Sequence, residues 1–129
     1  RRHGWRTGAS GSKDPQDLMR FVRHPFFERD LIGIVDHIVE VTQGDTGAAL
    51  RRLDEVDALL RSIADNPTSG VRLEGRLEGW LVRHGGSGHR LTIVFRPDVE
   101  ADIIYFALVA FGGRAWMRLA STRHMFPDF

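Results

Sequence analysis

The spacing of apolar residues changes once along the chain, near residues 66–70, and this change limits the folds that are possible. Before it, residues 26–42 and residues 45–66 carry apolar side chains three and four positions apart, which is typical of amphipathic helices. After it, short apolar segments alternate with turn residues, which indicates strands. The pattern therefore predicts an α+β fold in which two helices precede most of the sheet.

Prolines and short polar segments mark the ends of the first predicted elements. Pro25 favours a strand before it, over residues 20–23, and a helix start after it. The polar turn at residues 43–45 is short, so the two helices should form an antiparallel hairpin. Asp45 or Thr46 can cap the second helix by accepting a hydrogen bond from a free backbone amide.

The second half of the chain predicts three strands joined by turns. The glycine-rich run at residues 85–88 predicts a hairpin turn, because glycine adopts positive φ angles at little cost. This turn should join strands at residues 80–84 and 89–96, and residues 97–98 should open the next turn. Residues 102–111 are apolar on both faces, as expected of a central strand. The predicted architecture is an N-terminal strand, an antiparallel helix hairpin and a mainly antiparallel three-strand meander, with the sheet face opposite the helices open to a ligand or partner.

The length and the two ends of the chain predict its domain organisation. With 129 residues the chain suits one compact core, and we expect a single domain over residues 19–129. Residues 1–18 are polar and rich in glycine and serine, so we expect there either a native flexible arm or an added remnant. Near residues 115–119 the C-terminal tail should form a turn of helix.

Composition excludes several classes of site. No cysteine is present, so disulfides and thiolate metal sites are excluded. The six histidines show no metal-binding spacing and no nucleotide-binding motif occurs, so we expect neither a metal nor a cofactor. The net charge is only +1, so a nucleic-acid site would have to come from local clustering of basic residues. No apolar run approaches the roughly 18 residues of a membrane helix, and we expect a cytoplasmic protein without a membrane partner.

One ordered set of residues in the second half points to a family. The chain resembles the RelE/ParE superfamily of small bacterial toxins, which includes the plasmid stabilisation proteins, over roughly residues 21–116. The predicted order of helices and strands is similar as well. The residues that carry the resemblance are, in order, Leu73, Glu74, Gly75, Gly79, Trp80, Arg83, the glycine turn, His89, Arg90, Leu91, Gly112, Gly113 and Arg114.

The resemblance implies a toxin of a type II toxin–antitoxin system, which a cognate antitoxin neutralises by forming a tight hetero-oligomer. RelE-like members are ribonucleases that cut messenger RNA on the ribosome, so the first expectation is a metal-independent endoribonuclease that cuts messenger RNA through a basic site on the sheet. ParE-like members instead poison DNA gyrase and lack the ribonuclease residues. A third hypothesis is a degenerate, non-toxic member that serves as a binding module.

Three arginines form the main candidate site. Arg83, Arg90 and Arg114 stand where the resemblance places basic residues on two strands and just after the last one. Arginine suits the stabilisation of a phosphorane, because its rigid fork of donors matches phosphate oxygens and its charge persists at physiological pH. The three side chains are therefore expected to converge on one sheet face and bind RNA.

The proton-transfer groups of such a ribonuclease are less well defined in the sequence. The family commonly has a lysine near the position of Leu81 and an aromatic hydroxyl or histidine where this chain has Ala120 or Trp116. His84 and His89 flank the glycine turn and are candidate acids or bases, because histidine titrates near neutral pH. Glu74 is a further candidate base, and so is Glu78 close by. In YoeB-like relatives a glutamate acts as the base. Trp80 is either a stacking platform for a base or part of the core.

Overall fold

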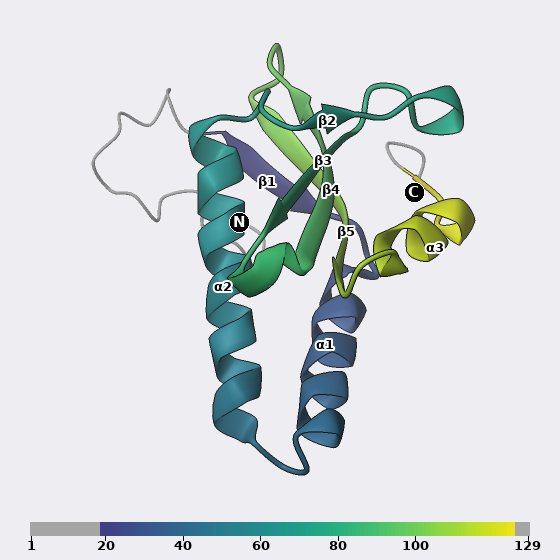
Figure 1. Ribbon diagram of the computed structural model, residues 1–129. Helices are drawn as coiled ribbons and strands as arrows, with labels where there is room; N and C mark the ends of the chain where they lie inside the picture. The colour runs from purple at the N-terminus through teal and green to yellow at the C-terminus, as the bar shows by residue number, and fades with distance from the viewer. Residues whose placement is uncertain (1–18, 126–129) are drawn as a thin grey trace.

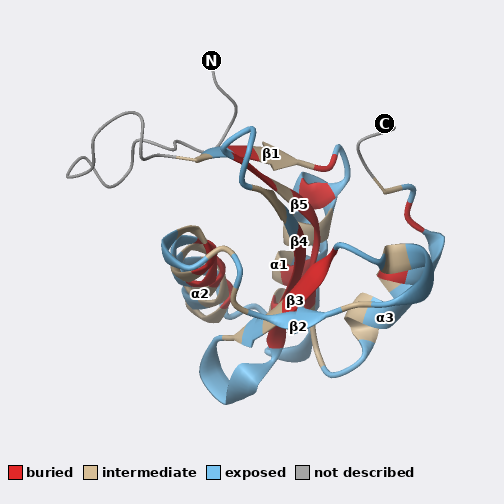
Figure 2. Ribbon diagram, turned by 90° about the horizontal axis from the view of Figure 1, so that it is seen from above, coloured by how far each residue is buried: buried red, intermediate tan, exposed pale blue. Residues whose placement is uncertain are grey.

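The computed structural model describes residues 19–125, which form a mixed five-stranded sheet with helices on both faces (Figures 1 and 2). The α+β class and the order of an N-terminal strand, a helix hairpin and a mainly antiparallel sheet are confirmed. The predicted arm, residues 1–18, lies outside the described residues. In the sheet order, the strands are β1 (Arg20–Arg23), β5 (Ile103–Phe111), β4 (Leu91–Asp98), β3 (Leu81–Gly85) and β2 (Val71–Arg72). β1 runs parallel to β5, and the other neighbours are antiparallel.

The helix hairpin consists of α1 (Phe27–Val41) and α2 (Thr46–Asp65), which pack against one face of the sheet. Asp45 caps α2, because its side chain accepts a hydrogen bond from the amide of Ala48 at 2.9 Å. The apolar stripe of each helix meets Phe95 and Phe106 of the sheet in one buried cluster. Burial of each large apolar side chain there contributes about 1.5–3 kcal/mol. The buried apolar residues of the two helices are Phe27, Ile34, Ile38, Ala49, Val56, Leu59, Leu60 and Ile63. No helix within residues 19–125 is long and apolar enough to span a membrane.

The opposite face of the sheet is covered by α3 (Ala115–Thr122), so the prediction of an open face is wrong (Figure 2). The helix is longer than the predicted single turn, because its apolar residues pack onto the sheet and hold it in place. Trp80 is only 3% exposed, which supports its interpretation as a core residue. The second cluster on this face includes Trp80, Val82, Val94, Leu108 and Ala120.

The turn predicted at residues 97–98 is also displaced. β4 continues through Pro97 and Asp98, which pair with Ile104 and Ile103 of β5. Proline is tolerated at this position because β3 begins only at Leu81, so the last residues of β4 have one free edge. The structure also contains the two-residue strand β2 and two short 3-10 turns, η3 (Gly75–Leu77) and η4 (Ser87–His89).

A buried ion pair joins α1, α3 and the free edge of β5. β1 is shorter than β5, and a register shift between Val94 and Phe95 leaves Ala107 without a pairing partner in β4. Arg123, just after α3, donates a hydrogen bond to the carbonyl of Ala107 at 3.0 Å. Asp30 of α1 accepts one from the amide of Val109 at 3.2 Å. The Arg123 guanidinium binds both Asp30 oxygens, at 2.7 and 2.9 Å, and the two side chains are 5% and 4% exposed.

His24 connects the end of β1 to the C-terminal segment. Its Nδ1 accepts a hydrogen bond from the amide of Phe26 at 3.0 Å, so Nε2 carries the proton and donates to the carbonyl of His124 at 2.7 Å. This arrangement needs the neutral imidazole. Burial lowers the pKa of His24, as does the nearby Arg123 charge, against the opposing effects of the His124 carbonyl and Asp30.

The lowered pKa predicts a pH dependence of stability. The unfolded chain takes up a proton at His24 near pH 6.5, whereas the folded chain does so only at lower pH, so the free energy of unfolding should fall as pH drops below about 6.5. His24→Gln removes this titration and should flatten the dependence between pH 7 and 5. Urea denaturation at several pH values measures it, with the exposed His89→Gln as matched control. Equal slopes in wild type and His24→Gln would contradict the assignment.

Candidate functional site

The predicted site residues lie at two opposite ends of the β3–β4 hairpin. Gly85 pairs with Leu91 at the turn end, and Leu81 pairs with Phe95 at the other end. His89 and Arg90 belong to the turn end, and so does Arg114, since β5 ends at Phe111 opposite Leu91. Glu74 lies at the end where β3 begins, because its neighbour Leu73 donates a backbone hydrogen bond to Trp80 at 2.9 Å.

Arg83 and His84 are neighbours on β3, and their side chains occupy opposite faces of the sheet. Arg83 extends toward the helix layer, where its Nη2 donates a hydrogen bond to the hydroxyl of Ser62 in α2. Its Nη1 is buried and is the one such side-chain atom within residues 19–125 that lacks a hydrogen-bond partner. His84 lies on the α3 side, where Nδ1 and the Thr92 hydroxyl are hydrogen-bonded at 2.8 Å.

Arg90 is exposed and lies over an aromatic ring. Its guanidinium carbon is 5.4 Å from the ring centroid of Phe111, and that of Arg52 in α2 is 5.1 Å from the same centroid. Arg52 also forms an ion pair with Glu55 at 2.6 Å. Arg51 and Arg52 carry no sequence signal of a function, because the mixed charges on α2 are typical of a solvated helix face.

Arg114 directly precedes α3, is exposed, and makes no side-chain hydrogen bond at the start of that helix. The structure thus brings Arg90, Arg114 and His89 to one end of the sheet, and His84 lies next to Gly85 at the same end, on the α3 side. Arg83 extends toward α2 instead, and Glu74 lies at the opposite end of the hairpin.

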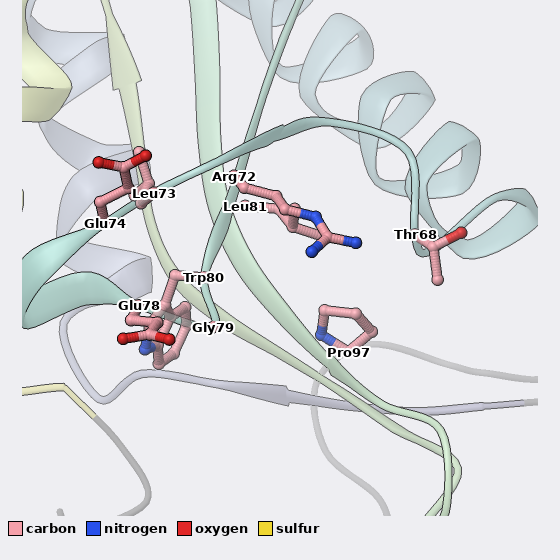
Figure 3. A pocket seen from close by; sticks show the side chains of 9 residues that line it. All are labelled: Thr68, Arg72, Leu73, Glu74, Glu78, Gly79, Trp80, Leu81 and Pro97. Atoms are coloured by element: carbon pink, nitrogen blue, oxygen red, sulfur yellow. The ribbon is translucent and has the colours of Figure 1, made fainter.

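A cavity of about 580 Å³ lies at the end where β3 begins (Figure 3). Figure 3 shows the Arg72 guanidinium between Thr68 and Pro97, on the side away from the carboxylates of Glu74 and Glu78. No ion pair joins either glutamate to an arginine within residues 19–125. Arg76 instead donates a hydrogen bond to the carbonyl of Ala120 in α3.

A second groove, of about 480 Å³, lies between α1, the free edge of β5 and α3. The Asp30–Arg123 pair forms part of its wall. Phe26 at its rim is 45% exposed, and the guanidinium carbon of Arg29 lies 4.3 Å from its ring centroid. An apolar groove with charged residues at its margin suits a partner segment that has one apolar face.

Comparison with known proteins identifies the fold. No protein-family profile matches the sequence, and no curated protein sequence does. A chain of the chromosomal ParDE toxin–antitoxin system from P. aeruginosa aligns with a TM-score of 0.57 and 15% identity, over 75% of this chain and 99% of its own. A chain of the RelBE2 toxin–antitoxin complex from Mycobacterium tuberculosis aligns with a TM-score of 0.50 and 16% identity, over 72% of this chain and 96% of its own. The chain therefore has the same fold as these two chains, which confirms the predicted fold.

The position of Arg83 can be tested through its contact with Ser62. Ser62→Ala removes the acceptor of a charged donor and should lower the free energy of unfolding by about 1–2 kcal/mol. In an Arg83→Met background, Ser62→Ala should lower the free energy of unfolding far less, because the guanidinium donor is already absent. Urea denaturation of the four proteins gives both values, and the exposed Ser87→Ala serves as control. An equal loss in the two backgrounds would place the Arg83 side chain elsewhere.

Proposed function

We propose that this chain, which has the fold of the RelE/ParE superfamily, is the toxin component of a type II toxin–antitoxin system. The fold is the observation that carries this proposal, since both aligned structures come from toxin–antitoxin systems. The earlier sequence resemblance, which depends on residues 71–116, supports the same assignment independently. As a toxin the chain inhibits growth, and a cognate antitoxin neutralises it.

The groove between α1, β5 and α3 suits the antitoxin. Its floor includes Ile34, Val109 and Ala110, which are buried and apolar, while Arg29 at the margin offers a charge to an acidic side chain. An amphipathic segment of the antitoxin can lay its apolar side chains in such a groove and contact the margin with polar ones.

Of the two mechanisms that the resemblance implies, the geometry favours a gyrase poison over a ribonuclease. Metal-free RNA cleavage needs a base, an acid and cations around one scissile phosphate. Arg83 extends toward α2, and Glu74 lies at the opposite end of the hairpin from Arg90. Poisoning of gyrase requires only a surface that binds this protein target. It does not require a base, an acid and cations around one phosphate.

Induction of the chain without antitoxin tests the mechanism. We expect growth arrest with an SOS response and trapped DNA cleavage complexes, while incorporation of labelled methionine continues during the first minutes. Arg83→Met, which keeps the buried stem but removes the guanidinium, should remain toxic. The ribonuclease would instead be established if the wild-type chain halts translation and cuts messenger RNA, and if both effects disappear in Arg83→Met, Arg90→Ala and Arg114→Ala.

The same experiment tests the toxin assignment itself. Normal growth of cells that accumulate folded protein would contradict it and favour the degenerate binding module. Circular dichroism of the purified chain establishes whether the protein is folded. Use of a host strain whose gyrase is sensitive excludes a resistant target as the reason for normal growth.

A further inference from the structure

A pocket of about 640 Å³ lies between the helix hairpin and the β3–β4 turn, on the helix side of the sheet. We call it the basic pocket and define it by the residues that carry its chemistry: His37, Arg51, Arg52, Ser87, Arg90 and Phe111. These come from α1, α2, the β3–β4 turn and the end of β5, so residues far apart in the sequence converge here. Its volume is in the range of sites for small ligands.

The positive charge in the basic pocket exceeds the negative charge. Three arginines line it, and Glu55 is the one carboxylate among its lining residues. Glu55 forms an ion pair with Arg52, so Arg51 and Arg90 remain without an ion-pair partner within residues 19–125. Like charges held close together raise the free energy of the folded chain, and a bound anion offsets that repulsion.

Phe111 holds two of these charges in place. The guanidinium carbons of Arg52 and Arg90 both lie within 5.5 Å of its ring centroid, at 5.1 and 5.4 Å. A guanidinium that lies over a ring keeps its N–H groups free to donate at its edges. The contact therefore orients donors from α2 and from the β3–β4 turn around the same pocket.

We propose that the basic pocket binds a phosphate group, carried either by a free nucleotide or by the 5′ end of a nucleic acid strand. Several arginine forks match the tetrahedral oxygens of phosphate better than a single planar carboxylate. A long strand along the helices is disfavoured, because Asp36, Glu40 and Asp54 are exposed on the same two helices and repel a polyanion. The proposal does not depend on the toxin assignment or on its mechanism.

Titration of the purified full chain at near-physiological salt tests the site. The probes are inorganic phosphate, adenosine monophosphate, a 5′-phosphorylated octathymidylate and an octaglutamate peptide. Binding is measured by calorimetry and by amide chemical shifts in ¹H–¹⁵N spectra. Arg51→Gln and Arg90→Gln remove pocket charges, and Arg61→Gln is the matched control, since it is exposed on α2 and does not line the pocket.

We expect saturable binding of a phosphate probe, with shifts at residues 51, 87 and 90. Each pocket substitution should weaken it about tenfold or more, and Arg61→Gln by no more than about twofold. Tighter binding of the 5′-phosphorylated strand than of the mononucleotide identifies a strand end as the source, and the reverse order identifies a free nucleotide. The proposal is overturned if no phosphate probe binds, if Arg61→Gln weakens binding as much as Arg90→Gln, or if only octaglutamate binds.

Discussion

The carboxylate of Asp30 and the guanidinium of Arg123 are 93 positions apart in sequence and meet beside the free edge of β5. β1 has only four residues, so beyond it the backbone of β5 needs other partners. The ion pair supplies them at Ala107 and Val109. Because each ion binds both the other ion and a backbone group, the pair meets the condition under which two buried charges offset their desolvation cost.

This contact also determines which surfaces of the sheet remain accessible. Arg123 follows α3 directly, so its attachment to Asp30 holds α3 over the face opposite the helix hairpin. That face would otherwise expose Val82, Val94 and Leu108 to water. With α3 in place, the accessible features within residues 19–125 include the groove beside α1, the cavity near Trp80 and the basic pocket. This arrangement is why a binding function has more geometric support than a ribonuclease centre on an open sheet face.

Local patterns in the sequence predict most of the fold. The apolar periodicity predicts both helices to within about one residue, and the glycine-rich run predicts the β3–β4 turn. Contacts between distant segments are not encoded in such patterns, so the sequence gives no sign of the Asp30–Arg123 pair or of a covered sheet face. β4 extends through Pro97 because its neighbour is shorter, which is likewise a tertiary effect.

The candidate site is harder to predict for a related reason. Leu81 and Val82 are both apolar and both buried, so alternation along β3 does not reveal which face Arg83 occupies. The family pattern predicts a basic residue at the position of Arg83. It does not predict on which face of the sheet that side chain lies. The basic pocket depends on residues from four separate segments of the chain, and only Arg90 and Ser87 of the glycine turn belong to the recognised motif.

Native-state hydrogen exchange of Asp30→Asn tests the central role of the buried ion pair most directly. The matched control is Glu55→Gln, a carboxylate substitution in the partly exposed Arg52–Glu55 pair. Leaving Arg123 buried without its partner should cost about 3–5 kcal/mol, so the amides of Val109 and α3 should exchange far faster than in wild type. In Glu55→Gln they should exchange at nearly the wild-type rate, since a partly exposed pair contributes at most about 1 kcal/mol. Unchanged protection of α3 in Asp30→Asn would contradict the account.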